Sequence, residues 1–374
     1  MLSNRLFQVG SVTAALLLCA GAAFAHGKGK PTQPGQNTPL VLKEQGGFSF
    51  GGKVDINAAG ESRHCDHGYT RFSIPTNARK LPIFMWHSTH VKTWESNPSF
   101  MGGHQAFQDI FLRRNWGVYI FDPPRQGQAS YGCFAPDYVS DWSQPGQDRS
   151  FISWRLGTWV PGGPYTFFPG SRMAPLGGAE LIDQILRARY PDNEHVPGAY
   201  EVQVAAVVKL LDKTGPAILF THSGSGRPGW MTAIASRKVA AIVDFEASVY
   251  AFPTGQAPPG STGQMEVPLA DFLKLTKIPI VVIHGDFLDR VPSGPPRLSN
   301  SLAFVEAVNN HGGNAKVIVL PDIGIHGNSH VMMLEENNVQ IADIVSKWLK
   351  KNRLDKGGKD NRHDDDDDDH HGRR

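Results

Sequence analysis

The sequence has few charged residues, and the two signs are nearly balanced. Charged side chains make up 19% of the 374 residues, and 37 basic groups oppose 35 acidic groups, which gives a formal net charge of +2 at pH 7. A nucleic-acid-binding protein normally carries a larger, clustered basic excess, and a disordered chain combines low hydrophobicity with a large net charge. Because 40% of the residues are apolar, we expect a folded protein with no nucleic-acid partner.

The apolar stretch near the start of the chain is too short to span a bilayer. It covers the 13 residues from Val12 to Phe24 and follows a single charge at Arg5, whereas a spanning helix needs about 20 residues. The small residues of Ala23-Phe24-Ala25 have the form of a signal-peptide cleavage site. We therefore interpret 1–25 as a cleaved signal peptide and expect a periplasmic or secreted protein with no membrane span after cleavage.

Cysteine is also scarce. Of the three cysteines, two follow the expected cleavage site, at Cys65 and Cys133. In an oxidising compartment they could form one disulfide, but two unrelated buried thiols explain the sequence equally well, because it does not supply the geometry that a disulfide requires. The pairing is left open here.

The remaining composition suggests one large folded region between two polar ends. Forty glycines and 27 prolines exclude a coiled coil and predict many tight loops. We interpret 26–40 as a flexible linker, 41–353 as the folded body, and 354–374 as a disordered Asp/His-rich tail. A tail of carboxylates and imidazoles could hold divalent cations, but a solvated charge run is favoured. The sequence predicts no metal site or cofactor in the body.

Within the body, short apolar runs alternate with helical segments. The expected strands are 82–86, 118–121, 217–220, 239–245, 280–284 and 316–320. The expected helices are 107–114, 202–211, a segment after 226, and 338–350. Buried runs separated by helices predict a parallel sheet with helices on both faces. This alternation stops at 133–200, which is rich in aromatic residues, glycine and proline, and we interpret that insertion as a lid lining an acyl or aryl pocket.

The most informative segment joins an expected strand to a helix. The strand 217–220 is followed by Thr221-His-Ser-Gly-Ser-Gly226, so that Ser223 lies at a turn of small residues before the helix. A G-x-S-x-G turn exposes a nucleophilic serine in this context. Thr221 and Ser225 replace the two glycines, so the motif is imperfect, and Ser225 is a rival serine. The context nevertheless predicts Ser223 as the nucleophile.

A nucleophilic serine needs a base, and the base needs an orienting acid. His326 and His330 both lie on the loop after the last expected strand, where an α/β hydrolase places its base. For the acid, two positions stay open, and an unpaired carboxylate at the end of a buried strand would be costly. They are Glu246, after 239–245, and the pair Asp286 and Asp289, after 280–284.

These segments resemble secreted and periplasmic bacterial α/β-hydrolase esterases with a Ser–His–Glu triad. The resemblance covers most of the body, from Leu81 to Leu349. Thr221–Gly226 matches the G-H-S-x-S-G elbow except at its first position, and Gly327–His330, followed by Glu336–Asp343, matches G-N-[ST]-H. The resemblance implies that the nucleophile is Ser223, the base His330 and the acid Glu246.

The resemblance also implies an oxyanion hole. Its first donor would be the N–H of Gly224, and its second the N–H of Thr89 or Ser88, because Trp86–Thr89 and the following T-W-E resemble the corresponding loop of the family. The glycine and the paired cysteines expected in that loop are missing, so the second donor is not fixed. A post-strand loop, Asp122–Ser130, also matches, with one of its glycines replaced by Arg125.

Together these observations predict an α/β-hydrolase fold and a periplasmic or secreted serine carboxylic-ester hydrolase. The substrate would be a small ester with an apolar or aromatic group, and the reaction would need no cofactor. A lactonase, an amidase or a polyester depolymerase would share every residue named above. A non-catalytic binding protein is disfavoured because a candidate exists for each triad position. The sequence does not distinguish a monomer from a homodimer.

Overall fold

The computed structural model describes residues 39–88, 91–96, 104–133, 148–190, 196–261 and 263–357. They all belong to one compact unit. The expected signal peptide, nearly all of the expected linker and most of the expected tail lie outside these ranges. Among the described residues, no helix combines the length and the hydrophobicity that crossing a membrane requires.

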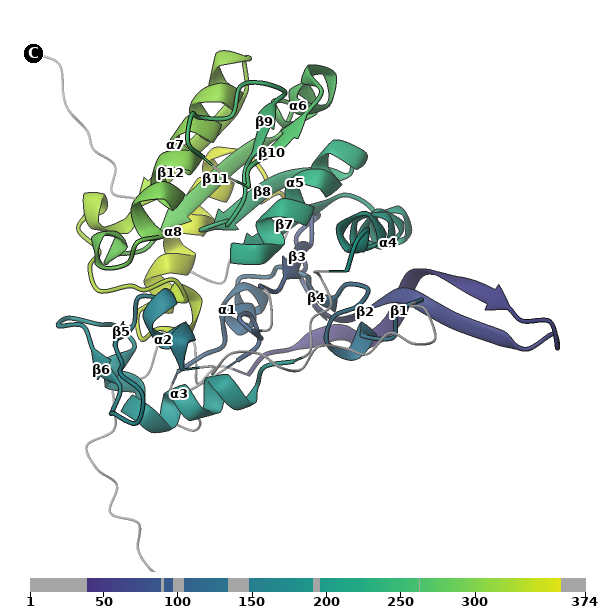
Figure 1. Cartoon of the computed structure of the whole chain (residues 1–374). Helices are drawn as coiled ribbons and strands as arrows, with labels where there is room; N and C mark the ends of the chain where they lie inside the picture. Colours follow the sequence, from purple (N-terminus) through teal and green to yellow (C-terminus); the bar gives the residue numbers. More distant parts are fainter. Residues whose placement is uncertain are drawn as a thin grey trace, which may run out of the picture. The chain divides into compact units, whose positions relative to one another are not determined.

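A mixed eight-stranded sheet forms the centre of the molecule (Figure 1). In sheet order its strands are β1 (Leu42–Ile56), β2 (Ser62–Pro75), β4 (Val118–Asp122), β3 (Ile83–Trp86), β7 (Ala217–His222), β8 (Val239–Phe245), β11 (Pro279–His284) and β12 (Asn314–Val319). The pairs β1–β2 and β2–β4 are antiparallel, and every other neighbouring pair is parallel. The parallel part brings the carboxyl ends of β7, β8, β11 and β12 to one edge.

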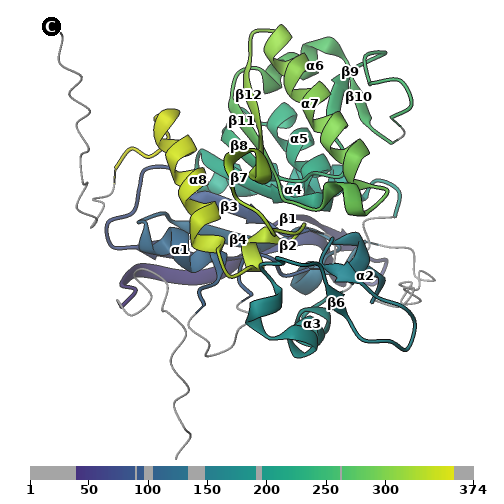
Figure 2. The same cartoon turned by 90° about the vertical axis from the view of Figure 1, so that its left-hand side faces the viewer.

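Helices lie on both faces of the sheet, as Figure 2 shows. Along β3, Ile83 and Met85 belong to one apolar cluster while Phe84 and Trp86 belong to the other, as the alternation of side chains along a strand requires. The first cluster includes α1 (Phe107–Arg113) and α8 (Asn338–Lys351). The second includes α4 (Ala199–Thr214), α5 (Gly226–Ala235), α6 (Leu269–Leu275) and α7 (Gly294–Asn310). The predicted mostly parallel sheet with helices on both faces is confirmed.

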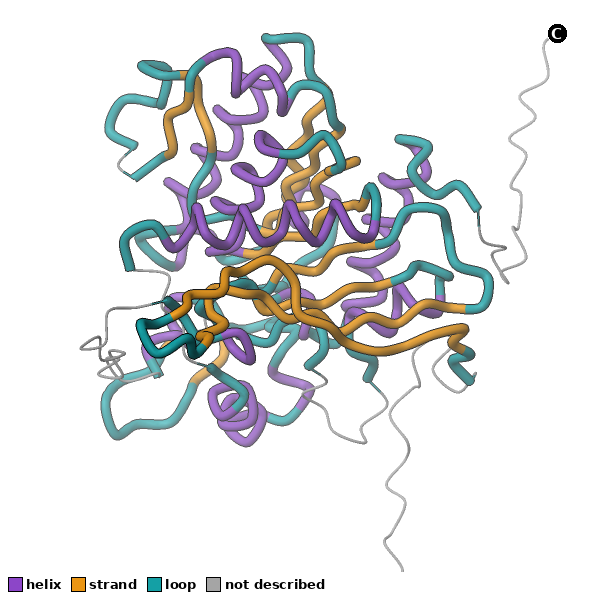
Figure 3. Tube along the Cα trace, turned by 90° about the vertical axis from the view of Figure 1, so that its right-hand side faces the viewer, coloured by secondary structure: helices purple, strands orange, loops and turns teal. Residues whose placement is uncertain are grey.

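The hairpin of β1 and β2 was not expected from the sequence. It extends from the sheet at the right of Figure 1 and crosses the front of Figure 3. Most of β1 is exposed, so the strand has no apolar run that would have predicted it. Cys65 of β2 and Cys133 form a disulfide with Cα atoms 5.1 Å apart. Of the two alternatives that the sequence left open, the structure has the paired cysteines.

A second link to the hairpin explains one departure from the resembled family. Arg125 replaces a glycine in the loop after β4 and has a φ of +72°. Its guanidinium forms a buried two-point ion pair with Asp66, with N–O distances of 2.9 and 3.2 Å. Asp66 also accepts a hydrogen bond from the backbone N–H of Cys133 at 3.1 Å. The substituted residue therefore ties the loop to the base of the hairpin beside the disulfide.

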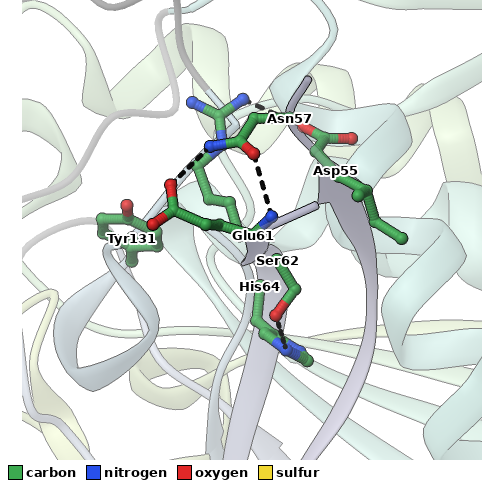
Figure 4. Close-up of a pocket in the computed structure, with 8 residues that line it drawn as sticks. Asp55, Asn57, Glu61, Ser62, His64 and Tyr131 are labelled. Atoms are coloured by element: carbon green, nitrogen blue, oxygen red, sulfur yellow. Dashed lines mark hydrogen bonds and ion pairs between the residues drawn. The ribbon is translucent and has the colours of Figure 1, made fainter. Parts of the chain in front are cut away.

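The tip of the hairpin carries a pocket, shown in Figure 4. It is lined by Asp55, Ile56, Asn57, Glu61, Ser62, Arg63, His64 and Tyr131. Asn57 donates a hydrogen bond to Glu61 at 2.7 Å, and Arg63 pairs with Asp55 at 2.9 Å (Figure 4). None of the residues predicted to be catalytic lines this pocket.

The described part of the insertion has secondary structure of its own. Residues 148–190 form α2 (Arg149–Ser153), the two-stranded ribbon of β5 (Gly157–Thr158) and β6 (Thr166–Phe167), and α3 (Gly178–Arg187). The buried side chains of Phe151, Leu156 and Leu181 belong to the same apolar cluster as α1 and α8. The base of the insertion is thus part of the core, while its role as a lid stays a prediction.

Candidate active site

Ser223 lies at a strained turn between β7 and α5. The strand ends at His222, a short 3-10 turn covers Ser223–Ser225, and α5 begins at Gly226. Ser223 has a φ of +54°, a region that a serine rarely adopts. Its side chain is partly exposed, and its hydroxyl lies 3.4 Å from that of Ser248. This is the geometry of a nucleophile elbow.

The contacts of Thr221 and Ser225 show how these residues fit where the elbow motif has glycines. Thr221 is buried and donates a hydrogen bond to Asp244 at 2.7 Å. A Cβ atom on Gly229 of α5 would lie 2.6 Å from the Thr221 methyl group, so a glycine on the helix provides the room that the motif places on the strand. The rival Ser225 is buried, and its hydroxyl bonds to backbone atoms of His222 and Trp86.

His330 and Glu246 form a buried hydrogen-bonded pair. His330 Nδ1 lies 2.7 Å from Glu246 Oε2, and the two side chains are 4% and 0% exposed. Glu246 immediately follows β8, and His330 lies on the loop after β12. Burial and the nearby charge of Arg297 lower the pKa of His330 to about 4, against the opposing effect of Glu246. His330 is therefore neutral near pH 7, as a base must be.

Glu246 is held by more contacts than those to the histidine. Oε1 accepts hydrogen bonds from the N–H of Gly285 at 2.7 Å and from the guanidinium of Arg155, which is itself buried. Glu246 has a φ of +53°, so its backbone is strained as well. Although burial alone would raise the pKa of Glu246, the Arg155 charge and the hydrogen bond to His330 hold it well below its ordinary value.

A second buried carboxylate organises the histidine loop. Glu335 accepts hydrogen bonds from the N–H of Ser329 at 2.7 Å and from the side-chain amide of Asn328 at 2.6 Å. The N–H of His330 donates to the carbonyl of Trp154 at 2.9 Å. Burial raises the pKa of Glu335 to about 7. The G-N-S-H segment is thus fixed by Glu335 from one side and by the insertion from the other.

The competing candidates lie elsewhere on the same loops. Asp286 accepts from the N–H groups of Phe287 and Gly327, at 2.6 and 2.9 Å. Its nearest imidazole is that of His326, at 3.6 Å, which is largely exposed. Asp289 is 80% exposed and lies 3.6 Å from its neighbour Arg290. Neither aspartate hydrogen-bonds to His330.

The oxyanion candidates are only partly described. Gly224 follows Ser223 in the 3-10 turn that leads into α5, and the first N–H groups of a helical segment have no partner within it. Ser88 is buried, and its carbonyl accepts a hydrogen bond from the Tyr190 hydroxyl at 2.9 Å. Thr89 lies outside the described residues, so the second donor stays a prediction.

Two arginines at the site were missed by the sequence analysis. Arg155 lies in the insertion, where the aromatic composition drew attention to pocket lining and gave no signal for a buried charge. Arg297 lies in α7, and its Nη1 donates to the backbone carbonyl of Glu246 at 2.8 Å. The sequence around Arg297 has no motif. Only the folded structure shows that these two arginines lie near the end of β8.

The chain is similar to a solved bacterial esterase and to a probable secreted lipase. No protein-family model matches the chain. A solved structure described as a novel bacterial esterase superposes with a TM-score of 0.67 at 27% identity and covers 86% of this chain and 99% of its own. A probable secreted lipase, phiG, from Fungal sp. (strain ATCC 74256) is 26% identical over 294 residues, which are 69% of this chain and 78% of the lipase. The chain is an esterase- or lipase-like hydrolase of the α/β-hydrolase fold.

Proposed function

We propose that the protein is a serine carboxylic-ester hydrolase that is exported from the cytoplasm and acts through Ser223, His330 and Glu246. The observation that supports the triad most is the buried hydrogen bond of 2.7 Å between His330 and Glu246, at the same sheet edge as the strained Ser223. Gly224 N–H, with Ser88 or Thr89, would supply the oxyanion hole.

The reaction would follow from the state of these groups. The hydrogen bond to ionised Glu246 keeps the proton of His330 on Nδ1, so Nε2 is unprotonated and can take the proton of Ser223. The Ser223 oxygen then attacks the ester carbonyl, and the oxyanion accepts a hydrogen bond from the Gly224 N–H. The alcohol leaves with the proton from His330. Water, activated by the same histidine, releases the acyl group.

The Ser223 hydroxyl must turn toward the histidine for this step. In the structure the Ser223 hydroxyl lies 3.4 Å from the Ser248 hydroxyl and makes no hydrogen bond to His330. Catalytic hydrogen bonds are often long or poorly aligned before the substrate binds. A rotation about the Ser223 side chain would replace the weak contact to Ser248 with one to His330.

Separate observations support export and the substrate class. A disulfide such as Cys65–Cys133 is typical of oxidising compartments, and the relative phiG is described as a probable secreted lipase. The aromatic residues of the insertion favour esters with an apolar or aromatic group, because such side chains line ligand pockets.

Activity profiling with a covalent label tests this proposal. The protein should hydrolyse p-nitrophenyl esters of graded acyl length and react with a fluorophosphonate probe at Ser223, as mapped by peptide mass spectrometry. Ser223→Ala should abolish both. The matched variant Ser225→Ala should still be labelled, because that hydroxyl is buried among backbone atoms. Labelling of Ser225 in folded Ser223→Ala, or no turnover and no labelling in the native protein, would contradict the proposal.

A further inference from the structure

Helix α7 places an arginine directly against the candidate base. Arg297 Nη1 lies 3.4 Å from His330 Nε2 and 3.5 Å from Nδ1, so the guanidinium is close to both ring nitrogens. The same Nη1 donates to the backbone carbonyl of Glu246 at 2.8 Å, which fixes its position. The Arg297 side chain is only partly buried, so it remains accessible to a ligand.

This position is beside the reacting atoms of the proposed mechanism. His330 Nδ1 is occupied by Glu246, so Nε2 is the nitrogen that must meet the Ser223 hydroxyl and the departing alcohol. A guanidinium 3.4 Å from Nε2 therefore lies within one hydrogen-bonded contact of the bound ester. Its remaining N–H donors are suited to a planar carboxylate.

The charge of Arg297 has no acidic partner in the described ranges of the chain. Among the described residues, no carboxylate lies within the 4.0 Å of an ion pair with Arg297. Each of the three buried arginines of the described chain has one: the pairs are Arg114–Asp343, Arg125–Asp66 and Arg155–Glu246. The Glu246 carboxylate, which lies nearby, is already taken by Arg155 and His330. Within the part of the chain that the structure describes, the site therefore has a cation without a counterion.

The uncompensated charge of Arg297 beside His330 disfavours the protonated form of this base. The charged or titratable groups around His330 are Glu246, Arg155, Arg297 and His222, and His284 lies near Glu246. Glu246 favours the imidazolium that forms during the reaction, whereas Arg297 opposes it and contributes to the low pKa of His330. An anion bound to Arg297 would cancel that opposition at the moment of catalysis.

We propose that Arg297 binds a carboxylate of the substrate, so that the preferred esters carry a negatively charged group close to the ester bond. This inference rests on the proposed function and narrows its substrate class. An apolar or aromatic ester with one carboxylate would place its body against the insertion and its charge on Arg297. The bond broken is still the ester bond, and the chemistry of the triad is unchanged.

Pairs of esters that differ only in charge test the inference. On the alcohol side the pair is 3-acetoxybenzoate and 3-acetoxybenzamide, and on the acyl side it is mono-4-nitrophenyl adipate and 4-nitrophenyl adipamate. The native protein should show a higher kcat/KM for the anionic member of at least one pair. Arg297→Gln should lower that anionic-to-neutral ratio by roughly 10- to 100-fold, the scale of one hydrogen bond to a charged group.

Two further variants make the result specific. Arg297→Lys keeps the charge and should keep most of the ratio, which also guards against a folding failure of Arg297→Gln. Arg290→Gln removes an exposed arginine that pairs with Asp289 and should leave the ratio unchanged. An unchanged ratio in folded Arg297→Gln, or an equal loss of kcat on both members, would overturn the inference. Absence of hydrolysis and of fluorophosphonate labelling in the native protein would instead overturn the proposed function first.

Discussion

The carboxyl ends of β8 and β11 are neighbours in the sheet, and both carry an acid, yet their surroundings differ completely. Glu246, after β8, is fully buried and bonds to His330 and Arg155. Asp286, after β11, accepts hydrogen bonds from backbone N–H groups of its own loop and of the loop that carries Gly327. Its nearest imidazole is that of the exposed His326. The triad acid of an α/β hydrolase usually follows the strand that corresponds to β11. That usual position does not determine which acid orients the base in this protein.

The difference arises from the length of the acidic side chain and from the positive charge that compensates it. The glutamate is one methylene longer than an aspartate, and its positive φ of +53° turns the side chain away from the strand direction. A buried carboxylate also needs compensation for its lost hydration, and the insertion supplies it with Arg155. Asp286 instead stabilises the loop that carries Gly327. The predictions below test this division of roles, in order of decreasing effect.

The largest effect should separate the two histidines. His330→Ala should lower kcat by on the order of 10⁶, as when the histidine of a serine-protease triad is removed. His326→Ala should lower kcat only slightly, because its side chain is 67% exposed and its contact to Asp286 is 3.6 Å. Steady-state kinetics of the two folded variants decides between them. The reverse ranking would move the base to the pair of His326 and Asp286.

The next effect should separate the two acids. Glu246→Gln should lower kcat by about 10⁴, the scale seen when the triad acid of a serine protease is neutralised. Asp286→Asn and Asp289→Asn should lose far less, since neither carboxylate hydrogen-bonds to His330. Thermal stability is measured alongside kcat for each variant. Near-native kcat in Glu246→Gln, together with an inactive but folded aspartate variant, would place the acid after β11.

A smaller effect should follow from the compensating cation. Arg155→Met breaks a buried ion pair and leaves the Glu246 charge uncompensated, which typically costs about 3–5 kcal/mol, so the midpoint of urea unfolding should fall markedly. The control Arg172→Met removes another arginine of the insertion, whose pair with Glu336 is half exposed, and should cost about 1 kcal/mol or less. Equal losses in the two variants would argue against a special role for Arg155.

The smallest effect concerns Asp244, the acid within β8. Burial raises the pKa of Asp244 from its ordinary value of 3.8 to about 7. Between these two values the unfolded chain releases its proton while the folded chain keeps it, so this group's contribution to the free energy of unfolding falls as pH rises from about 4 to 7. Asp244→Asn should make that decline shallower.

Urea unfolding at several pH values across this window measures the slope. Asp271→Asn, which removes an exposed carboxylate on α6 that pairs with Lys274, should leave the slope unchanged and serves as the control. A slope in Asp244→Asn equal to that of the native protein would show that Asp244 does not hold a proton in the folded state.

The parallel core and the position of Ser223 could be predicted because each has a local signal. The apolar strands 239–245 and 280–284 are continuous buried runs, and the elbow combines a strand, a serine and a helix start within ten residues. The hairpin β1–β2 gave no such signal because β1 is mostly exposed and β2 has no continuous buried run. Arg155 and Arg297 are separated from Glu246 by 91 and 51 positions, so only the fold brings them to the site.

The choice between Glu246 and Asp286 could not be made from local patterns either, because it depends on which carboxylate the buried arginine compensates. The resemblance to the glutamate-bearing esterases favours Glu246, and the hydrogen bond to His330 is the structural observation that supports it. The same dependence on distant residues explains why Thr221 could replace the first elbow glycine. Gly229, which makes room for Thr221, and Asp244, which accepts its hydrogen bond, lie 8 and 23 positions away.

The most direct test of this account is the low-field proton NMR signal of the His330 Nδ1–H. A proton donated from imidazole to a buried carboxylate at 2.7 Å should give a resolved signal well downfield of the amide region. We expect this signal in the native protein and in Asp286→Asn, and we expect it to disappear in His330→Ala and to disappear or move upfield in Glu246→Gln. A signal that persists unchanged in Glu246→Gln but is lost in Asp286→Asn would contradict the assignment of Glu246 as the acid.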